Sequence, residues 1–204
     1  MEDIHVRQAL PEDISDIVEL ENKIWPEGTR APQEKFEKRL AVFSQGFLLA
    51  LKGSELIGAS TSEIISYHEG DSIKSWEHIT DNGYIKETHN PKGNALYIVS
   101  LGALSRSGGG SALLSRQKET ARKLGLSILV LGARVPGYDN YCKKIREIHI
   151  NEYILLKRAD GSPYDDELRF YIRNGLKIDK IMPNYMEDDS ESRNYGAVMT
   201  FVLK

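Results

Sequence analysis

The chain has 204 residues, a net charge of −3 at pH 7 and a single cysteine, Cys142. This length fits one domain, and we expect residues 1–204 to form a single folded unit. One cysteine excludes an intrachain disulfide and suits a reducing compartment. Charges of both signs are mixed along the chain, whereas nucleic-acid binders carry a basic face. With no signal-peptide pattern and no apolar run of about 18 residues, we expect a cytoplasmic protein that binds neither nucleic acid nor membranes.

The amino-terminal part of the chain predicts a strand, two helices and a hairpin. Residues 5–9 have the pattern of a strand, and Pro11 starts a helix with isoleucines at helical spacing. A second helix begins near Pro32. Two further strands, residues 47–51 and 56–67, are separated by a short turn with a glycine, which predicts a hairpin.

The middle of the chain begins with a polar insertion, residues 68–93, which we expect to be irregular with one helical turn. Residues 95–103 form an apolar strand that we expect to be buried on both faces. A glycine-rich turn at residues 105–110 leads into a helix at residues 111–124. Residues 127–133 predict another buried strand.

The carboxyl-terminal part holds a second insert, residues 136–166, in which residues 148–156 favour a helix. A short helix at residues 168–174 and strands at residues 176–182 and 195–203 complete the chain. Strand, helix and strand in the middle imply a parallel right-handed crossover, and the hairpins on either side imply antiparallel pairs. We therefore predict an α/β (α+β) fold: a mixed, mostly antiparallel central sheet with helices on both faces and a central βαβ crossover.

The glycine-rich segment Ser105-Arg-Ser-Gly-Gly-Gly-Ser111 joins the buried strand directly to a helix. Adjacent glycines let the backbone turn tightly and approach a ligand closely. The first N–H groups of a helix have no internal partners and carry the positive end of its dipole. This arrangement binds a pyrophosphate without a basic side chain, so the segment predicts a pyrophosphate site.

Three other interpretations of the segment fit its residues less well. A flexible Gly/Ser linker has this composition, but the strand and the amphipathic helix leave no spare residues between them. A nucleoside-triphosphate P-loop needs Gly-Lys-Ser/Thr, whereas Gly110 is followed by Ser111 and Ala112. A dinucleotide site has a fingerprint of spaced glycines, which three adjacent glycines do not match. The strand also comes in the middle of the chain, after hairpins, where this site is not expected.

Gly108-Gly-Gly-Ser-Ala-Leu-Leu114 resembles the Gly-x-Gly-x-x-Leu-Leu core of the acetyl-CoA signature in GNAT N-acetyltransferases. Tyr171-Ile-Arg-Asn-Gly-Leu176 resembles the later Tyr-x-x-x-Gly-Phe motif of that family, with Leu176 in place of phenylalanine. Residues 132–138 and 183–189 resemble GNAT domains that are fused to carbon–nitrogen hydrolases, although no hydrolase domain is present in this sequence. Ser105 stands where the family usually has Gln or Arg.

The resemblance implies transfer of an acetyl or other acyl group from acetyl-CoA to a primary amine of a small molecule or peptide, by direct attack in a ternary complex. It implies that residues 95–103 splay from the next strand and that pantetheine lies in the gap. Tyr171 is the matching catalytic candidate, as proton donor to the CoA thiolate; the alternative is a tyrosine that only packs. The implied cofactor-binding residues are Leu101, Gly102, Ala103, Arg106, Ser107, Gly108, Gly109, Gly110 and Ser111.

No general base is identifiable, and the candidates for binding the acceptor are weaker. Strand alternation places Tyr97 and Ser100 on opposite faces, so only one of them should face the cleft. Glu63 borders the expected acceptor site, but an outward, solvated glutamate is the other interpretation. Arg134 and Tyr138 follow the end of a strand, where ligands bind in open α/β sheets. Arg134 either clamps a substrate carboxylate or forms a surface ion pair.

The other reactive side chains predict no further site. Cys142 has no evident histidine partner, and His78 and His89 lack the spacing of metal ligands, so we expect no metal. The acidic segment at residues 187–191 lacks the ligand order of a calcium loop, and we expect it to be a solvated hairpin tip. Two function classes stay open beside the enzyme: a non-catalytic acyl-CoA-binding or sensor module, and a scaffold that binds no CoA. A homodimer through edge strands is one further arrangement.

Overall fold

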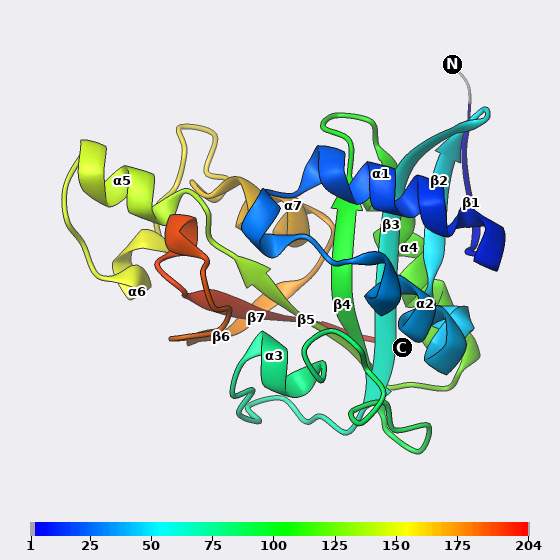
Figure 1. The fold of residues 1–204 in the computed structure, drawn as a ribbon. Helices are drawn as coiled ribbons and strands as arrows, with labels where there is room; N and C mark the ends of the chain where they lie inside the picture. The colour runs from blue at the N-terminus through cyan, green and yellow to red at the C-terminus, as the bar shows by residue number, and fades with distance from the viewer. Residues whose placement is uncertain (1–2, 204) are drawn as a thin grey trace.

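The computed structural model describes residues 3–203, and its centre is a 7-stranded sheet (Figure 1). The strands lie in the order β1-β2-β3-β4-β5-β7-β6. Only β4 and β5 are parallel, and every other neighbouring pair is antiparallel. The predicted mixed, mostly antiparallel sheet with one central crossover is therefore confirmed.

The amino-terminal elements match the prediction closely. The turn between the two hairpin strands contains Gly53, whose φ of +59° is a conformation that favours glycine. The polar insertion contains a single helical turn, as expected. In chain order the elements are β1 (Ile4–Gln8), α1 (Ile14–Ile24), α2 (Gln33–Phe43), β2 (Leu48–Lys52), β3 (Glu55–Ile65) and α3 (Trp76–Ile79).

The remaining elements contain two departures from the prediction. Helix α4 begins two residues earlier than expected, because only Gly108, with a φ of +84°, is needed for the turn before it. The second insert contains an additional helix, α5, whose short polar sequence gave no clear period. The elements are β4 (Ala95–Ala103), α4 (Gly109–Lys123), β5 (Ile128–Arg134), α5 (Tyr138–Lys144), α6 (Ile150–Tyr153), α7 (Asp166–Arg173), β6 (Lys177–Met182) and β7 (Gly196–Val202).

Helices cover both faces of the sheet. Helices α1 and α2 pack on β3 from one side, and α4 packs on β2, β3 and β4 from the other (Figure 1). The buried face of α4 presents Leu113, Leu114 and Ala121 at helical spacing to the core. Helix α7 contacts β5 and β6. Helix α4, which the glycine-rich segment begins, and the amino-terminal helices therefore lie on opposite sides of the central strands.

The second insert forms a lobe at one end of the sheet, with α5 and α6 (Figure 1, left). Its interior is a cluster of tyrosine rings; those of Tyr138 and Tyr153 have centroids 5.1 Å apart, and those of Tyr141 and Tyr164 are 5.3 Å apart. Aromatic pairs at these separations stabilise a small core. Across residues 3–203, no helix combines the length and the apolar character that crossing a membrane requires.

Candidate active site

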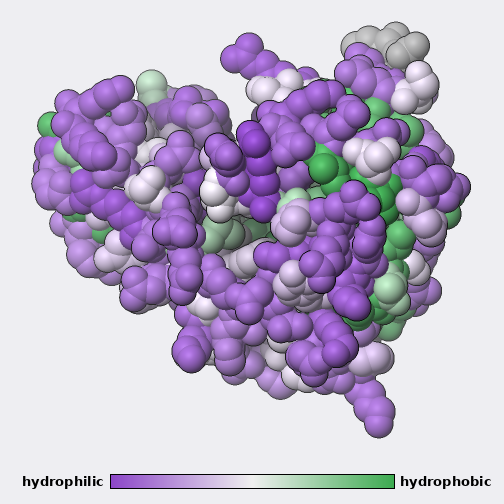
Figure 2. All heavy atoms as spheres, viewed as in Figure 1, coloured by the Kyte–Doolittle hydropathy of each residue, from purple (hydrophilic) through white to green (hydrophobic). Residues whose placement is uncertain are grey.

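A cleft opens in the middle of the sheet because β4 and β5 separate. Their parallel pairing joins Ala95–Ile98 to Ile128–Leu131 and then stops, although β4 continues to Ala103. The separation implied by the family resemblance is therefore present. A cavity of about 230 Å³ lies beside the gap, lined by residues of both strands, including Ser100 and Leu101 of β4 and Gly132 and Arg134 of β5. Figure 2 shows the molecular surface hollowed at this place.

A β-bulge at Val99 changes which side chains of β4 face the cleft. Ser100 pairs with Thr61 while Ile98 pairs with Ser62, so Val99 is the extra residue on β4. A bulge reverses the alternation of side chains beyond it. Tyr97 and Ser100 therefore lie on the same face of the sheet, and the prediction that they lie on opposite faces is wrong. The Trp76 Nε1–H donates to the Val99 carbonyl at 2.9 Å and satisfies the backbone group that the bulge displaces.

Of these two residues, only Ser100 lines the cleft. Tyr97 is fully buried, and its hydroxyl shares a hydrogen bond of 2.7 Å with the Tyr185 hydroxyl. Burial raises the pKa of Tyr97 well above its usual value, with the neighbouring Tyr185 and Glu63 adding to the effect. Tyr97 is thus a core residue beneath the site.

The glycine-rich loop begins α4 with free N–H groups. Arg106 and Gly108 both have left-handed backbone, with φ of +58° and +84°. The Gly109 N–H donates to Ser107 Oγ at 3.1 Å. Within the described chain, the N–H groups of Gly110 and Ser111 have no hydrogen-bond acceptor. Unpaired N–H groups at the start of a fifteen-residue helix form an anion-binding site.

Helix α7 brings two ionisable side chains to the cleft, one helical turn apart. Its amino terminus is capped by Asp165, whose Oδ1 accepts from the N–H groups of Glu167 and Leu168. Glu167 and Tyr171 then project from the same side of the helix into the cleft. Asp165 therefore fixes the direction in which the helix enters the site.

Glu167 is half-buried and lines the cleft. Burial raises the pKa of its carboxyl to about 8, although the charge of Arg134 opposes the shift. Burial likewise raises the pKa of Tyr171, and the Glu167 charge adds to it. Neither side chain has a hydrogen-bond partner among residues 3–203. Glu167 was not predicted as a site residue from the sequence. Its position four residues before the motif tyrosine places it on the same side of the helix, and this spacing could have indicated it.

Arg134 is held by the acidic loop that follows β6. Its Nε and Nη2 donate to the two Asp189 carboxylate oxygens at 2.8 and 2.5 Å, and Nη2 also meets Glu191 at 2.8 Å. The predicted solvated tip at residues 187–191 is exposed except for Asp189, which is 1% exposed. Arg134 lines the cleft, but its guanidinium is already paired within the protein, in a buried ion pair and not at the surface.

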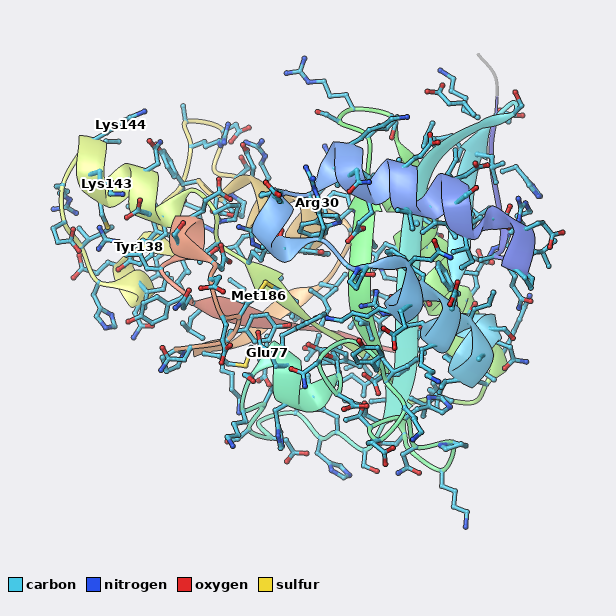
Figure 3. The ribbon with its side chains drawn as sticks, viewed as in Figure 1. Arg30, Glu77, Tyr138, Lys143, Lys144 and Met186 are labelled. Carbon is cyan, nitrogen blue, oxygen red and sulfur yellow. The ribbon has the colours of Figure 1, made fainter. Side chains whose placement is uncertain are left out.

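Helices α2 and α3 and the segment before α2 complete the lining of the cleft. Arg39 is 2% exposed and donates from Nε to the Gly83 carbonyl at 2.6 Å. Its Nη1 donates to the hydroxyls of Thr61 and Ser100, both at 3.3 Å. Lys35, one turn earlier on α2, also lines the cleft. Figure 3 shows Arg30 on one side of the opening and Glu77 and Met186 on the other.

Besides Tyr97, two further predicted acceptor-site residues do not line the cleft. Glu63 is fully buried below it, not solvated, and its Oε2 accepts from Thr88 Oγ1 at 2.7 Å. Burial raises the pKa of Glu63 to about 8, partly offset by the Thr88 hydrogen bond and by Arg39. Tyr138 lies in the tyrosine lobe, where its hydroxyl donates to the Ile148 carbonyl. Cys142 is buried next to the same carbonyl.

Two curated proteins match the chain by sequence, and no protein-family model does. The uncharacterized N-acetyltransferase YkwB of Bacillus subtilis is 30% identical over 207 residues, which cover 97% of this chain and 88% of that protein. The probable hydrolase YhcX of the same organism is 30% identical over 197 residues. That match covers 95% of this chain but only 37% of the hydrolase, which is consistent with the resemblance to hydrolase-fused domains.

Solved structures show the same fold. The loading GNATL domain of CurA from Lyngbya majuscula has a TM-score of 0.85 at 22% identity, covering 98% of both chains. The GNAT-like decarboxylase GphF, in complex with isobutyryl-CoA, has a TM-score of 0.81 at 22% identity, covering 98% of this chain and 100% of that one. The fold and the relatives define an acyltransferase. The chain belongs to the GNAT superfamily of N-acetyltransferases.

Proposed function

We propose that the protein transfers an acetyl group from acetyl-CoA to a primary amine of a small molecule or peptide by direct attack in a ternary complex. The observation that carries the proposal is the parting of β4 from β5 directly beside the glycine-rich start of α4. A curated relative named as an N-acetyltransferase and a structural neighbour bound to an acyl-CoA support it.

The residues at the gap fit this co-substrate. The unpaired N–H groups of Gly110 and Ser111 suit a pyrophosphate, and the exposed Arg106 suits an additional phosphate. The backbone of Leu101 and Ala103 lies beyond the last pair with β5, where it is free to hydrogen-bond an extended amide chain. When bound, acetyl-CoA supplies an activated thioester carbonyl. No metal is part of the proposal.

Glu167 and Tyr171 are the groups we assign to proton transfer. Glu167 takes the proton that the amine loses as its nitrogen forms the new C–N bond. Tyr171 donates its hydroxyl proton to the sulfur as the C–S bond breaks. Both side chains line the cleft and have no other partner among the described residues, so neither must break an internal hydrogen bond to act. The raised pKa of Glu167, about 8, predicts that the rate increases with pH up to this range.

The binding step is tested by thermal unfolding with saturating acetyl-CoA and with adenosine as control. At about 100 times the dissociation constant a ligand stabilises the folded state by about 2.7 kcal/mol, a Tm increase of roughly 5–10 °C. Gly110→Glu should remove the increase, because a Cβ at this position already meets Phe170 at 3.2 Å and the carboxylate repels phosphate. Ser115→Glu places the same charge on an exposed position of the same helix and should retain it. No Tm increase in the wild type at millimolar acetyl-CoA would contradict the proposal.

The chemical step is tested by CoA release with an amine present. Tyr171→Phe should lower kcat by about 10²–10⁴-fold while the dissociation constant of acetyl-CoA is unchanged. Glu167→Gln should lower kcat and flatten the pH profile near 8. An unchanged kcat in Tyr171→Phe would mean that this tyrosine only packs. Binding without CoA release for any amine would favour the non-catalytic acyl-CoA-binding module.

A further inference from the structure

Two cationic side chains, Lys35 and Arg39, lie one turn apart on α2 and both line the cleft. Residues four apart on a helix project from the same side. Neither forms an ion pair with any of residues 3–203, whereas Arg134 forms two. Burial of a charge is costly unless a counter-charge is close. Glu21 and Glu77 also line the cleft and act on these cations only through longer-range attraction, so both cations can still take an anionic ligand as a direct partner.

Both cations have donors to offer a ligand. Arg39 uses Nε and Nη1 internally, and its Nη2 has no acceptor among the described residues. The Lys35 ammonium lies 5.9 Å from the centre of the Trp76 ring and 5.4 Å from that of Tyr84. These aromatic faces orient the ammonium without using its hydrogen-bond donors. Burial lowers the pKa of Lys35 and repulsion by Arg39 lowers it further, while the charge of Glu77 opposes the shift. An anion between the two cations relieves that repulsion.

The position of Arg39 relative to the gap limits what the anion can be. Arg39 Nη1 donates to Ser100 Oγ at 3.3 Å, and Ser100 lies just beyond Ile98, where β4 leaves β5. The guanidinium thus lies beside the place where the proposed function puts the thioester. An anion held there must be close to the attacking nitrogen. The α-carboxylate of an amino acid satisfies this condition, because one carbon separates it from the amine.

Helix α3 lines the same cleft and offers a negative group for the amine. Glu77 Oε1 accepts from the Glu187 N–H at 2.9 Å, while its Oε2 is buried with no donor in the described chain. Glu77 lines the cleft that Lys35 and Arg39 also line, and Figure 3 shows it on α3. A buried carboxylate oxygen without a donor is costly and suits an incoming ammonium. The cleft therefore carries a carboxylate and two cations that form no ion pair with one another, as a zwitterion requires.

We propose that the acceptor is a free α-amino acid, whose carboxylate binds Lys35 and Arg39 and whose amino group enters on the Glu77 side. The inference rests on the proposed acetyl transfer and names its acceptor class. A peptide amino terminus does not meet the condition, because an uncharged amide replaces the carboxylate next to its amine. The same holds for simple amines.

The test compares three forms of each acceptor at saturating acetyl-CoA. CoA release is measured with the protein L-amino acids, and for every active one with its α-amide and with the amine that lacks the carboxylate. We expect kcat/KM to be about 100-fold higher for the amino acid, the value of a charge-assisted hydrogen-bonded pair. Lys35→Met and Arg39→Lys should raise KM for the amino acid at least about 10-fold. For the amine that lacks a carboxylate, both substitutions should lower kcat/KM less than they do for the amino acid. Lys38→Met, an exposed position of the same helix, is the matched control and should change neither.

Each other outcome has a defined meaning. Equal kcat/KM for amino acid, amide and amine would overturn the amino-acid inference and leave the proposed function standing. Binding of acetyl-CoA without acetylation of any amine would overturn both. Loss of CO₂ from malonyl-CoA without an amine, abolished in Lys35→Met, would show that the cations hold a carboxylate of the acyl group, which also overturns the inference. Lys35 is half-buried at the cleft surface, so its variant keeps the test valid if Arg39→Lys fails to fold.

Discussion

Two buried arginines line the cleft, and they differ in the partners that the fold gives them. Burial lowers the pKa of Arg134, but its hydrogen bonds to Asp189 and Glu191 outweigh that effect and raise the pKa above its ordinary value. Arg39 is 2% exposed, against 8% for Arg134, and donates only to hydroxyls and a carbonyl. Burial lowers its pKa to about 10, although the charges of Glu21 and Glu63 oppose the shift. One arginine is therefore neutralised by carboxylates in direct contact and holds a loop in place. The other lies beside the gap with no carboxylate in direct contact, which is what a ligand site needs.

Removal of the carboxylate behind Arg134 should have the largest effect. Asp189→Ala leaves a buried guanidinium with only the exposed Glu191 as partner. Breaking a buried pair in this way costs about 3–5 kcal/mol, and we expect that loss in the free energy of unfolding from urea titration. A loss below about 1 kcal/mol would mean that the charge of Arg134 is no better neutralised than that of Arg39. This result would contradict the difference between the two arginines.

Glu63→Gln tests whether a carboxyl near Arg39 neutralises it. Folded Glu63 has a pKa of about 8 against an ordinary 4.5, so the folded state holds this proton more tightly than the unfolded chain. Wild-type stability should therefore fall as pH rises from 4.5 to 8, and glutamine removes that fall. We expect the stability advantage of Glu63→Gln to grow across this window to about 5 kcal/mol and then stay constant, measured as the difference in unfolding free energy between the two proteins. A difference independent of pH would identify Glu63 as an ionised counter-charge for Arg39.

Gly83→Ala tests how closely Arg39 is packed. Gly83 has a φ of +81°, and a Cβ there would lie 2.6 Å from Arg39 Nη2 and 2.7 Å from Trp76. Backbone strain and the clash together should cost about 1–3 kcal/mol and raise KM for the acceptor. Gly70→Ala has a φ of +91° but meets nothing within 4 Å, so it carries the backbone cost alone. Equal losses for both variants would show that Arg39 and Trp76 can move freely.

Glu191→Ala should have the smallest effect. Its carboxylate also meets Arg134, but its side chain is 57% exposed. Exposed ion pairs contribute about 0.2–1 kcal/mol, and we expect a loss in that range by the same urea titration, smaller still at high salt. A loss as large as that of Asp189→Ala would show that the two carboxylates act as a unit.

The elements whose signals are local were predictable from the sequence. The bounds of β4 match the prediction, because an apolar run followed by a polar, glycine-rich segment defines both the strand and its end. Gly125 ends α4 with a φ of +69°, as a glycine after a helix does. The bulge at Val99 was not predictable, because an extra residue is defined only by the partner strand. It reversed the expected relation between Tyr97 and Ser100.

The candidate site was predictable only where a local sequence motif forms it. The glycine loop and Tyr171 stand in recognisable motifs, whereas the charged residues of the cleft come from segments far apart in the chain. Arg134 and Asp189 are 55 residues apart, and no local pattern indicates that such residues meet. The burial of Glu63 also depends on residues that are distant in the chain, because the polar insertion covers it and Thr88 donates a hydrogen bond to it.

The parting of β4 and β5 gives the interior of the sheet an open strand edge. β4 pairs with β3 along its full length, but with β5 only from Ala95 to Ile98. Backbone amides held in a continuous sheet exchange with solvent deuterium slowly, and amides without a partner exchange fast. In β4, the amides that face the gap beyond Ile98 should therefore exchange fast, while the amides up to Ile98 and those that face β3 exchange slowly. A bound molecule that takes the place of the missing partner would convert the fast class into the slow one.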